Sequence, residues 1–186
     1  MIFISIATRY YVRVLKFIPY IIIHKKVVDQ KGAGAVIIFA WDSNTKTAVI
    51  IKEYNPGCNK ILSGLAAGIV ETDVEKHGAD FDIAAKHELE EECHLSGGTW
   101  YKLVDDGVSV PMDKYAKTEL VAYLVVDAVK VNNPRSLDDE EDIEIIQGVS
   151  VPSILRMIQR GEMNLVGGWG SLLAINKLRE LGEISS

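Results

Sequence analysis

The chain has 186 residues, of which 48% are hydrophobic and 25% charged, a composition typical of one globular domain with a sizeable core. Its formal net charge is −6 and its pI about 5.3, and the lack of a basic block argues against nucleic acid as a principal partner. The same acidity would repel a small polyanionic substrate unless metal ions intervened.

The two cysteines and the N-terminus indicate a cellular location. Cys58 and Cys93 fit no C-x-x-C or Cys/His zinc spacing, so we expect a reducing, cytoplasmic environment. The longest apolar run near the N-terminus, residues 17–23, is far shorter than the roughly 20 residues of a membrane-spanning helix. No cleavage pattern of small residues follows it, so we expect neither a signal peptide nor membrane association.

The first part of the chain predicts strands, because it is rich in β-branched and aromatic residues. Turn residues at 42–44 separate two of these strands and indicate a hairpin. The expected strands are residues 1–7, 10–17, 20–28, 35–41, 47–53 and 60–65.

A helix is expected after a polar loop over residues 72–78. Asp80 or Asp82 can begin it, since a carboxylate at that place accepts the unpaired N–H groups of the first turn. The helix should run to about His94 and stop before the glycine pair at 97–98.

This helix carries an acidic face. Glu88, Glu91 and Glu92 stand at i, i+3 and i+4, so their carboxylates are expected on one side. Such a face is either a solvated surface or a clamp for hard divalent cations such as Mg²⁺, which take carboxylate oxygens. Three residues on another side form an apolar stripe that can dock on a core: Ala85, Leu89 and Cys93.

The second half alternates strands and helices. Strands are expected over residues 100–105, 119–131 and 144–149, with an acidic surface loop over 132–142. Two helices, residues 151–160 and 171–181, follow and are joined by a glycine-rich link. The order of elements predicts an α/β fold in which a mixed sheet lies between helices, an αβα layer arrangement.

Two segments together resemble the Nudix hydrolase box, G-x5-E-x7-R-E-U-x-E-E-x-G-U, in which U is a bulky aliphatic residue. They are residues 66–71 (AAGIVE) and 87–95 (HELEEECHL). Five residues of the second segment fall in register with the pattern: Glu88, Leu89, Glu91, Glu92 and Leu95.

The chain also departs from this pattern. His87 stands where the family has an arginine that holds the box carboxylates, and imidazole lacks the rigid fork of a guanidinium. His94 stands where the family has glycine and should end the helix. The stretch from Gly68 to His87 is five residues longer than the pattern, which leaves Glu75 as the nearest match to the middle glutamate. Two other histidines are expected at the surface: His24 and His77.

Further similarity is to the ADP-ribose and ADP-sugar pyrophosphatases among Nudix hydrolases. It lies in residues 48–54 (AVIIKEY), 65–71 and 138–143 (DDEEDI), and extends over about residues 35 to 182. The resemblance implies a Nudix-like αβα hydrolase domain over residues 35–186.

The same resemblance implies a subdomain of N-terminal strands over residues 1–34. In the similar pyrophosphatases this subdomain pairs two subunits, and exposed edge strands favour such pairing. We therefore expect a homodimer.

The resemblance also implies a metal site and its ligands. Glu88 and Glu92 are the first choices, with the Ala67 carbonyl from the loop before Gly68, and Glu91 is either a ligand or an orienting residue. Glu141, on the late acidic loop, is the expected general base or an additional ligand. The implied cofactor is Mg²⁺, with Mn²⁺ as an alternative.

Substrate contacts are less sharply defined. Lys52 and Glu53, at the end of a strand, can face the phosphates and ribose of the substrate or simply reach solvent. Four aromatic residues are candidates for stacking on a base, with core packing as the alternative: Trp41, Tyr54, Trp100 and Tyr115.

Three functions remain open at this point. The first is Mg²⁺-dependent hydrolysis of ADP-ribose or an ADP-sugar to AMP and a sugar phosphate. The second keeps this mechanism but acts on another nucleoside diphosphate sugar or a dinucleotide. The third is a catalytically weak Nudix-fold module that binds a nucleotide, as the departures at His87 and His94 allow.

Overall fold

The computed structural model of the chain describes residues 32–112, 117–137 and 142–185. The strands expected over 1–7, 10–17 and 20–28 lie outside these residues, so the dimerisation role of residues 1–34 stays a prediction. Three residues singled out in the sequence also lie outside them: His24, Tyr115 and Glu141.

Strand β1 (Gly34–Asp42) is the centre of the sheet. All but the last of its residues are buried, which agrees with its continuous apolar sequence. It pairs in parallel with β8 (Glu119–Val126) along one side. On its other side it pairs antiparallel with β4 (Ala66–Val70) through its first half and with β2 (Thr47–Asn55) at its end.

The remaining strands extend this arrangement into a mixed eight-stranded sheet with the central order β10-β2-β1-β8-β6. Two further strands pair with each other in a separate two-stranded ribbon. The bounds are β3 Lys60–Gly64, β6 Thr99–Lys102, β7 Val110–Pro111 and β10 Ile143–Val149 in the sheet, and β5 Leu95–Ser96 and β9 Val129–Lys130 in the ribbon.

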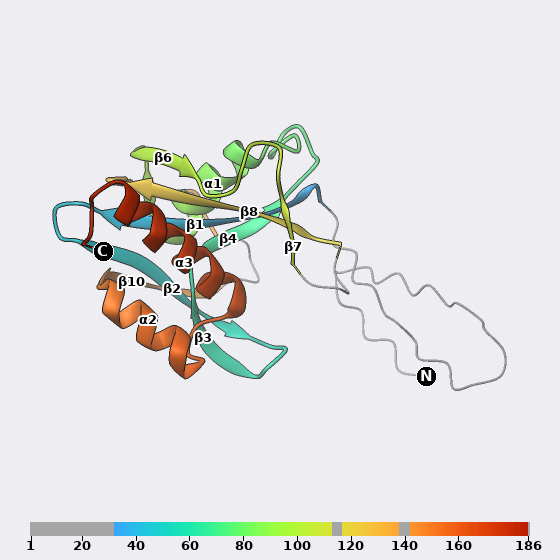
Figure 1. Ribbon diagram of the computed structural model, residues 1–186. Coiled ribbons are helices and arrows are strands. Elements are labelled where there is room, and N and C mark those ends of the chain that lie inside the picture. Colours follow the sequence, from blue (N-terminus) through green and yellow to red (C-terminus); the bar gives the residue numbers. More distant parts are fainter. Residues whose placement is uncertain (1–31, 113–116, 138–141, 186) are drawn as a thin grey trace.

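Helices cover both faces of the sheet. Helix α1 (Phe81–Cys93) lies on one face, and α2 (Val151–Arg160) and α3 (Leu165–Glu180) lie on the other (Figure 1). The predicted αβα layers with a mixed sheet are therefore confirmed. Among the described residues, none of the helices has the length and apolar character needed to cross a membrane.

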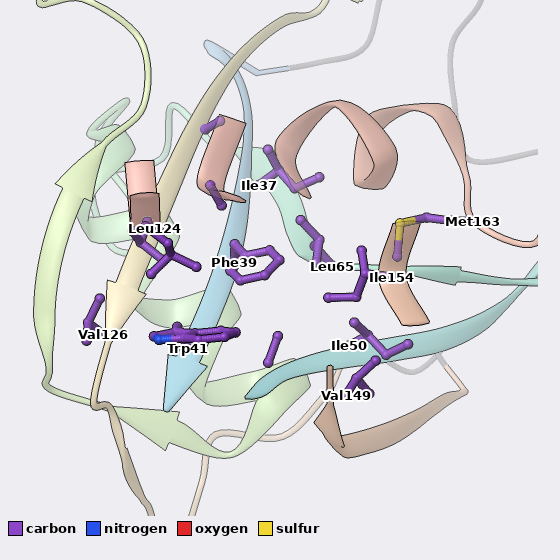
Figure 2. Close-up of a cluster of buried hydrophobic side chains, with 14 residues drawn as sticks. Ile37, Phe39, Trp41, Ile50, Leu65, Leu124, Val126, Val149, Ile154 and Met163 are labelled. Atoms are coloured by element: carbon purple, nitrogen blue, oxygen red, sulfur yellow. The ribbon is translucent and has the colours of Figure 1, made fainter. Parts of the chain in front are cut away.

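The two cores are built from alternate residues of β1, because successive side chains of a strand point to opposite faces. Phe39 and Trp41 belong to the core under α2 and α3, which Figure 2 shows. Val36 and Ile38 belong to the core under α1, with Leu89 of that helix. Because β1 is buried on both faces, a shift of its pairing by one residue would exchange the side chains of the two cores, so its register is fixed.

The glycine-rich segment before residue 171 is helical, so its prediction as a link was wrong. Helix α3 begins at Leu165, and the side chain of Asn164 caps it by accepting the N–H of Gly167 at 2.6 Å. Packing explains the glycines: a Cβ at Gly170 would lie 3.2 Å from Leu65 Cδ1, tighter than ordinary contact. The lack of side chains lets α3 approach the sheet closely.

The strand expected over residues 119–131 is interrupted at Asp127. This residue has a φ of 58°, a left-handed conformation that aspartate tolerates better than most residues. Its carboxylate accepts hydrogen bonds from Ser43 N at 2.8 Å and Ser43 Oγ at 2.7 Å. The chain turns there and continues as β9.

Helix α1 begins and ends as expected. The Asp80 carboxylate accepts the N–H groups of Asp82 at 2.8 Å and Ile83 at 3.1 Å. His94 follows the last residue in a left-handed conformation with a φ of 57°, and its N–H donates to Glu90 O at 3.0 Å. The Nudix pattern has glycine at this position, the residue that adopts this conformation without a steric cost.

Replacement of Asp80 tests the helix start. Asp80→Ala should lower the free energy of unfolding by about 0.5–2 kcal/mol, because two N–H groups lose their acceptor. Asp80→Asn should retain most of the stability, and Asp106→Ala, at an exposed turn, is the control. Urea unfolding measures all three. Equal stability of the Asp80→Ala and Asp106→Ala proteins would show that the cap contributes nothing.

Candidate functional site

Helix α1 lies directly on strand β4, and this contact forms the candidate site. Ala85, Leu89 and Cys93 are buried in the core, as the predicted apolar stripe requires. Ala84, one turn before Glu88, is buried as well. The apolar residues thus fix the rotation of the helix and bring the glutamates between them to the edge of β4.

Glu92 is buried against the backbone of β4. Its exposed fraction is only 4%, and its Oε2 accepts the N–H of Ala67 at 2.8 Å. A buried carboxylate is unfavourable unless it is hydrogen-bonded, so this contact is a condition for its burial. Ala67 was expected on a loop, but it lies within β4. The pairing of β4 with β1 holds its peptide in place.

Glu88 lies one turn before Glu92, against the next residue of β4. A Cβ built on Gly68 would overlap the Glu88 carboxylate, so only glycine leaves room for it in this position. Glu88 and Glu92 therefore meet two consecutive residues of one strand. This explains why the glycine and these two glutamates belong to one motif although they are far apart in the sequence.

Glu91 has different surroundings. Its Oε1 lies 3.7 Å from Nη1 of Arg135, in the segment 131–137 that follows β9. The backbone N–H of Arg135 donates to Oε1 of the neighbouring Glu90 at 3.1 Å. The acidic face predicted from helical spacing is thus divided between β4 and this segment.

His87 stands between two loops. Its Nε2 lies 3.1 Å from Nη2 of Arg135, and its ring centroid is 5.3 Å from that of His77. Burial, followed by the charge of Arg135 and then His77, lowers the pKa of the His87 imidazole, against an opposing effect of Glu90. These surroundings favour the neutral imidazole.

His77 was expected at the surface, and this prediction was wrong. Its exposed fraction is 9%, and its Nδ1 accepts the N–H of Glu71 at 3.1 Å. The N–H of Ala79 donates to Glu71 O at 2.9 Å, so the long loop closes on the end of β4 and encloses the ring. Glu75 in this loop is exposed, and its backbone N–H donates to Asp73 Oδ1.

Neither His77 nor Arg135 was recognised from the sequence as part of this site. Both lie in polar loops without a periodic pattern. The one available signal was the missing arginine at position 87, which raises the question of what cation lies there instead.

Lys52 and Glu53 lie on opposite faces of the sheet, because they are neighbours on β2. Ile51 belongs to the core under α1, which places Glu53 on the α1 side. Lys52 lies on the other side, where its Nζ is 3.8 Å from Glu144 Oε2 of β10. The structure therefore brings Glu53, but not Lys52, to the face that carries the glutamates of α1.

The aromatic candidates are mostly structural. Trp41 is a core residue, and Trp100 packs edge-on against Tyr123 with ring centroids 6.0 Å apart. Tyr54 is 51% exposed, and its hydroxyl donates to Asn59 Oδ1 at 2.6 Å.

The residues present fit a magnesium ion only in part. Within the described ranges, no three His, Cys, Asp or Glu side chains gather as a complete metal-binding group. Glu88 and Glu92 supply two carboxylates beside the Ala67–Gly68 backbone, and all of these donors are hard oxygen ligands. Mg²⁺ usually takes one or two carboxylates and completes its shell with water and substrate phosphates. The donor set therefore suits this ion in a substrate complex.

A pocket of about 470 Å³ lies elsewhere in the molecule. It opens between the β1–β2 hairpin and the β5–β9 ribbon, and Asp42, Lys130 and Gln147 are among its lining residues. None of the glutamates of α1 lines it, so it is distinct from the candidate site.

Comparison with known proteins supports the fold. No family model matches the sequence, and no curated protein matches it. Among solved structures, the crystal structure of an ADP compounds hydrolase is similar with a TM-score of 0.62 and 13% sequence identity. The match covers 87% of this chain and 82% of that chain. At this identity the likeness shows a shared fold, and it is the Nudix-like fold that the sequence predicts.

The surroundings of His87 predict a dependence of stability on pH. Its folded pKa lies below the unfolded value of 6.5, so the unfolded chain binds the proton more readily. The contribution to stability is present above pH 6.5 and is lost as the pH falls through the folded pKa. In metal-free buffer, the free energy of unfolding should therefore fall more between about pH 7.5 and 5.5 in the unmodified protein than in His87→Gln.

Urea unfolding at the two pH values measures this difference. Arg156→Gln keeps His87 and its neighbours and is the control, which should show the pH dependence of the unmodified protein. An identical pH dependence in His87→Gln would contradict the prediction.

Proposed function

We propose that this chain is a Mg²⁺-dependent diphosphatase of the Nudix type, which hydrolyses ADP-ribose or an ADP-sugar to AMP and a sugar phosphate. The observation that carries the proposal is the pair Glu88 and Glu92, held one helical turn apart against Ala67 and Gly68 of β4. The similar fold of the ADP compounds hydrolase supports the same class of reaction.

The chemistry explains the need for this pair. Both phosphates of a diphosphate are negatively charged and repel an attacking water, and bound Mg²⁺ would neutralise this charge and favour ionisation of the water. Glu88, Glu92 and the Ala67 carbonyl are the proposed ligands, and Glu91 is a further ligand or orients them. The hydrogen bond from Ala67 N–H fixes the Glu92 carboxylate before a ligand binds, so the side chain loses less orientational freedom on binding.

Hydrolysis also needs a proton acceptor. The oxygen of water forms a bond to one phosphorus, the bond from that phosphorus to the bridging oxygen breaks, and the water loses a proton. We assign this proton to Glu141, which lies outside the described residues. On the substrate side, Glu53 is the better-placed of the two predicted residues, because it shares the face of the sheet with α1.

The proposal includes a homodimer formed through residues 1–34 and a reducing, cytoplasmic location. The state of the cysteines is compatible with that location: Cys58 and Cys93 are both free thiols. Burial raises the pKa of the Cys93 thiol, so it is an unreactive core residue.

A second candidate function is a catalytically weak module that binds a nucleotide. The observation that favours it is His87, which offers fewer donors to the carboxylates than the arginine of the Nudix pattern. A third variant keeps the reaction but uses another nucleoside diphosphate sugar or a dinucleotide, since the carboxylate pair identifies the bond and not the nucleoside.

The direct test is release of AMP from ADP-ribose in the presence of Mg²⁺, alongside a panel of other nucleoside diphosphate compounds. Glu92→Gln should lower kcat by about 100-fold or more, because the neutral amide keeps the shape and the Ala67 contact but not the charge. Glu180→Gln, an exposed glutamate of α3, is the matched control and should retain full activity. Saturable binding across the panel without turnover would favour the binding module.

A second test uses the contact between Gly68 and Glu88. Gly68→Ala should displace the Glu88 carboxylate and lower kcat by about 10–100-fold. The free energy of unfolding should change by less than about 1 kcal/mol, because a flexible carboxylate end moves rather than the backbone. The control is Gly57→Ala, where a Cβ meets nothing within 4 Å. Full activity of Gly68→Ala would remove Glu88 from the proposed site.

A further inference from the structure

Arg135 makes contact with three residues over more than one turn of α1. Its backbone N–H donates to Glu90 Oε1 at 3.1 Å, its Nη2 lies 3.1 Å from His87 Nε2, and its Nη1 lies 3.7 Å from Glu91 Oε1. The first two distances are hydrogen bonds, and the third is an ion pair. Arg135, from a distant part of the sequence, thus binds the acidic helix through its backbone N–H and through both Nη atoms of its guanidinium.

The chain before Arg135 brings it to this position. Leu95 pairs with Lys130 in the β5–β9 ribbon, and Val131 N donates to His94 O at 2.9 Å, so the segment starts at the C-terminal end of α1. Four residues span at most about 13 Å when extended, and the seven residues from His94 back to His87 rise about 10 Å along the helix. The segment is therefore long enough to reach His87.

Local sequence favours an extended course over this distance. Pro134 precedes Arg135. Its ring fixes its own φ and disfavours a helical conformation at Asn133. The segment has no helix or strand of its own between residues 131 and 137. The proline reduces the conformational freedom of the segment, and the contacts of Arg135 fix its position.

The contact with Arg135 also defines the state of His87. A guanidinium only donates hydrogen bonds, so His87 Nε2 is the acceptor and the proton of the neutral ring is on Nδ1. An arginine at position 87 would have no acceptor to offer and would place a second positive charge beside Arg135. The histidine and Arg135 are complementary for this reason.

From these contacts we infer that Arg135 is the positioning residue that orients Glu91 and the acidic face of α1, and that it supplies from the 131–137 segment the guanidinium which position 87 lacks. The inference rests on the proposed diphosphatase function. His77, enclosed by the longer loop, packs against the His87 ring and completes its surroundings.

The exposure of the pair indicates what Arg135 contributes. The side chains of Arg135 and Glu91 are 47% and 25% exposed, and ion pairs near the surface add little to folding stability. Its effect should therefore appear in the orientation of carboxylates and in turnover. Residues that orient metal ligands typically alter activity by about 10–100-fold when they are replaced.

The test compares Arg135→Ala, Arg135→Lys, His87→Arg and the double variant His87→Arg/Arg135→Ala, with kcat and KM for ADP-ribose and Mg²⁺ as readouts. Arg135→Ala should lower kcat by about 10–100-fold with little change in KM, and lysine should restore only part of it because it lacks the fork. The double variant should recover most of kcat, since one guanidinium is again present. Arg156→Ala, which removes a guanidinium bound to Ser153 Oγ on α2, is the matched control with unchanged turnover.

Two outcomes of the kinetic test would overturn the inference. One is a kcat of Arg135→Ala within about twofold of the unmodified protein. The other is a double variant as slow as Arg135→Ala although both are folded, which would show that the guanidinium has no common role at the two positions.

A readout without turnover separates this inference from the proposed function. Nitrogen NMR of the His87 ring in the metal-free protein should show the proton on Nδ1, and Arg135→Ala should shift the tautomer while Arg156→Ala should not. An unchanged ring signal in Arg135→Ala overturns the inference. Lack of turnover by the unmodified protein on the whole panel overturns the proposed function, and the ring signal then still decides whether Arg135 holds His87.

Discussion

The closeness of helix α1 to strand β4 is the constraint on which the candidate site depends. It is set by the apolar stripe beside the glutamates, where Ala85, Leu89 and Cys93 are buried in the core. It is possible at the glutamates because Gly68 has no side chain and because Ala67 N–H pairs with the buried Glu92 carboxylate. Apolar burial supplies the favourable free energy, and the polar contact prevents the cost of an unpaired buried charge. The proposed cation site is thus built by the same contacts that hold the helix in place.

Much of this arrangement was predictable from the sequence because it rests on periodicity. The apolar run over residues 35–41 predicted the strand β1, and the spacing of Leu89 and Cys93 predicted the docked side of α1. The start of α1 was predicted at Asp80 or Asp82, since capping is a local property of neighbouring residues, and Asp80 is the cap. Local rules failed where packing decides the outcome. Glycines are unfavourable in a helix, yet α3 contains Gly167 and Gly170 because a Cβ at either position would crowd Gly64 or Leu65.

The residues missed by sequence reasoning share a physical reason. Arg135 contacts residues far away in the sequence, whereas His77 contacts Glu71 and His87 across the loop that precedes α1. Neither kind of contact leaves a pattern in the loop sequence. Helical spacing placed Glu88, Glu91 and Glu92 together, but it could not say which neighbour each carboxylate meets. The fold separates them: two face the backbone of β4, and one faces Arg135. Periodicity predicts a face of a helix, whereas the partners of that face come from tertiary structure.

The departures from the Nudix pattern are connected by this distribution. Where α1 meets β4 the pattern is kept, by Glu88 and Glu92 on the helix and Gly68 on the strand. A substitution there would alter a backbone contact. The changes lie on the side where other loops meet the helix: His87 contacts Arg135, and the longer loop encloses His77 beside it. The contacts of Arg135 are with His87, Glu90 and Glu91 of α1, whereas Glu88 and Glu92 contact β4. The geometry of the carboxylate pair and the source of the neighbouring positive charge are therefore separable features of this fold, and only the first requires a particular residue at a particular place in the strand.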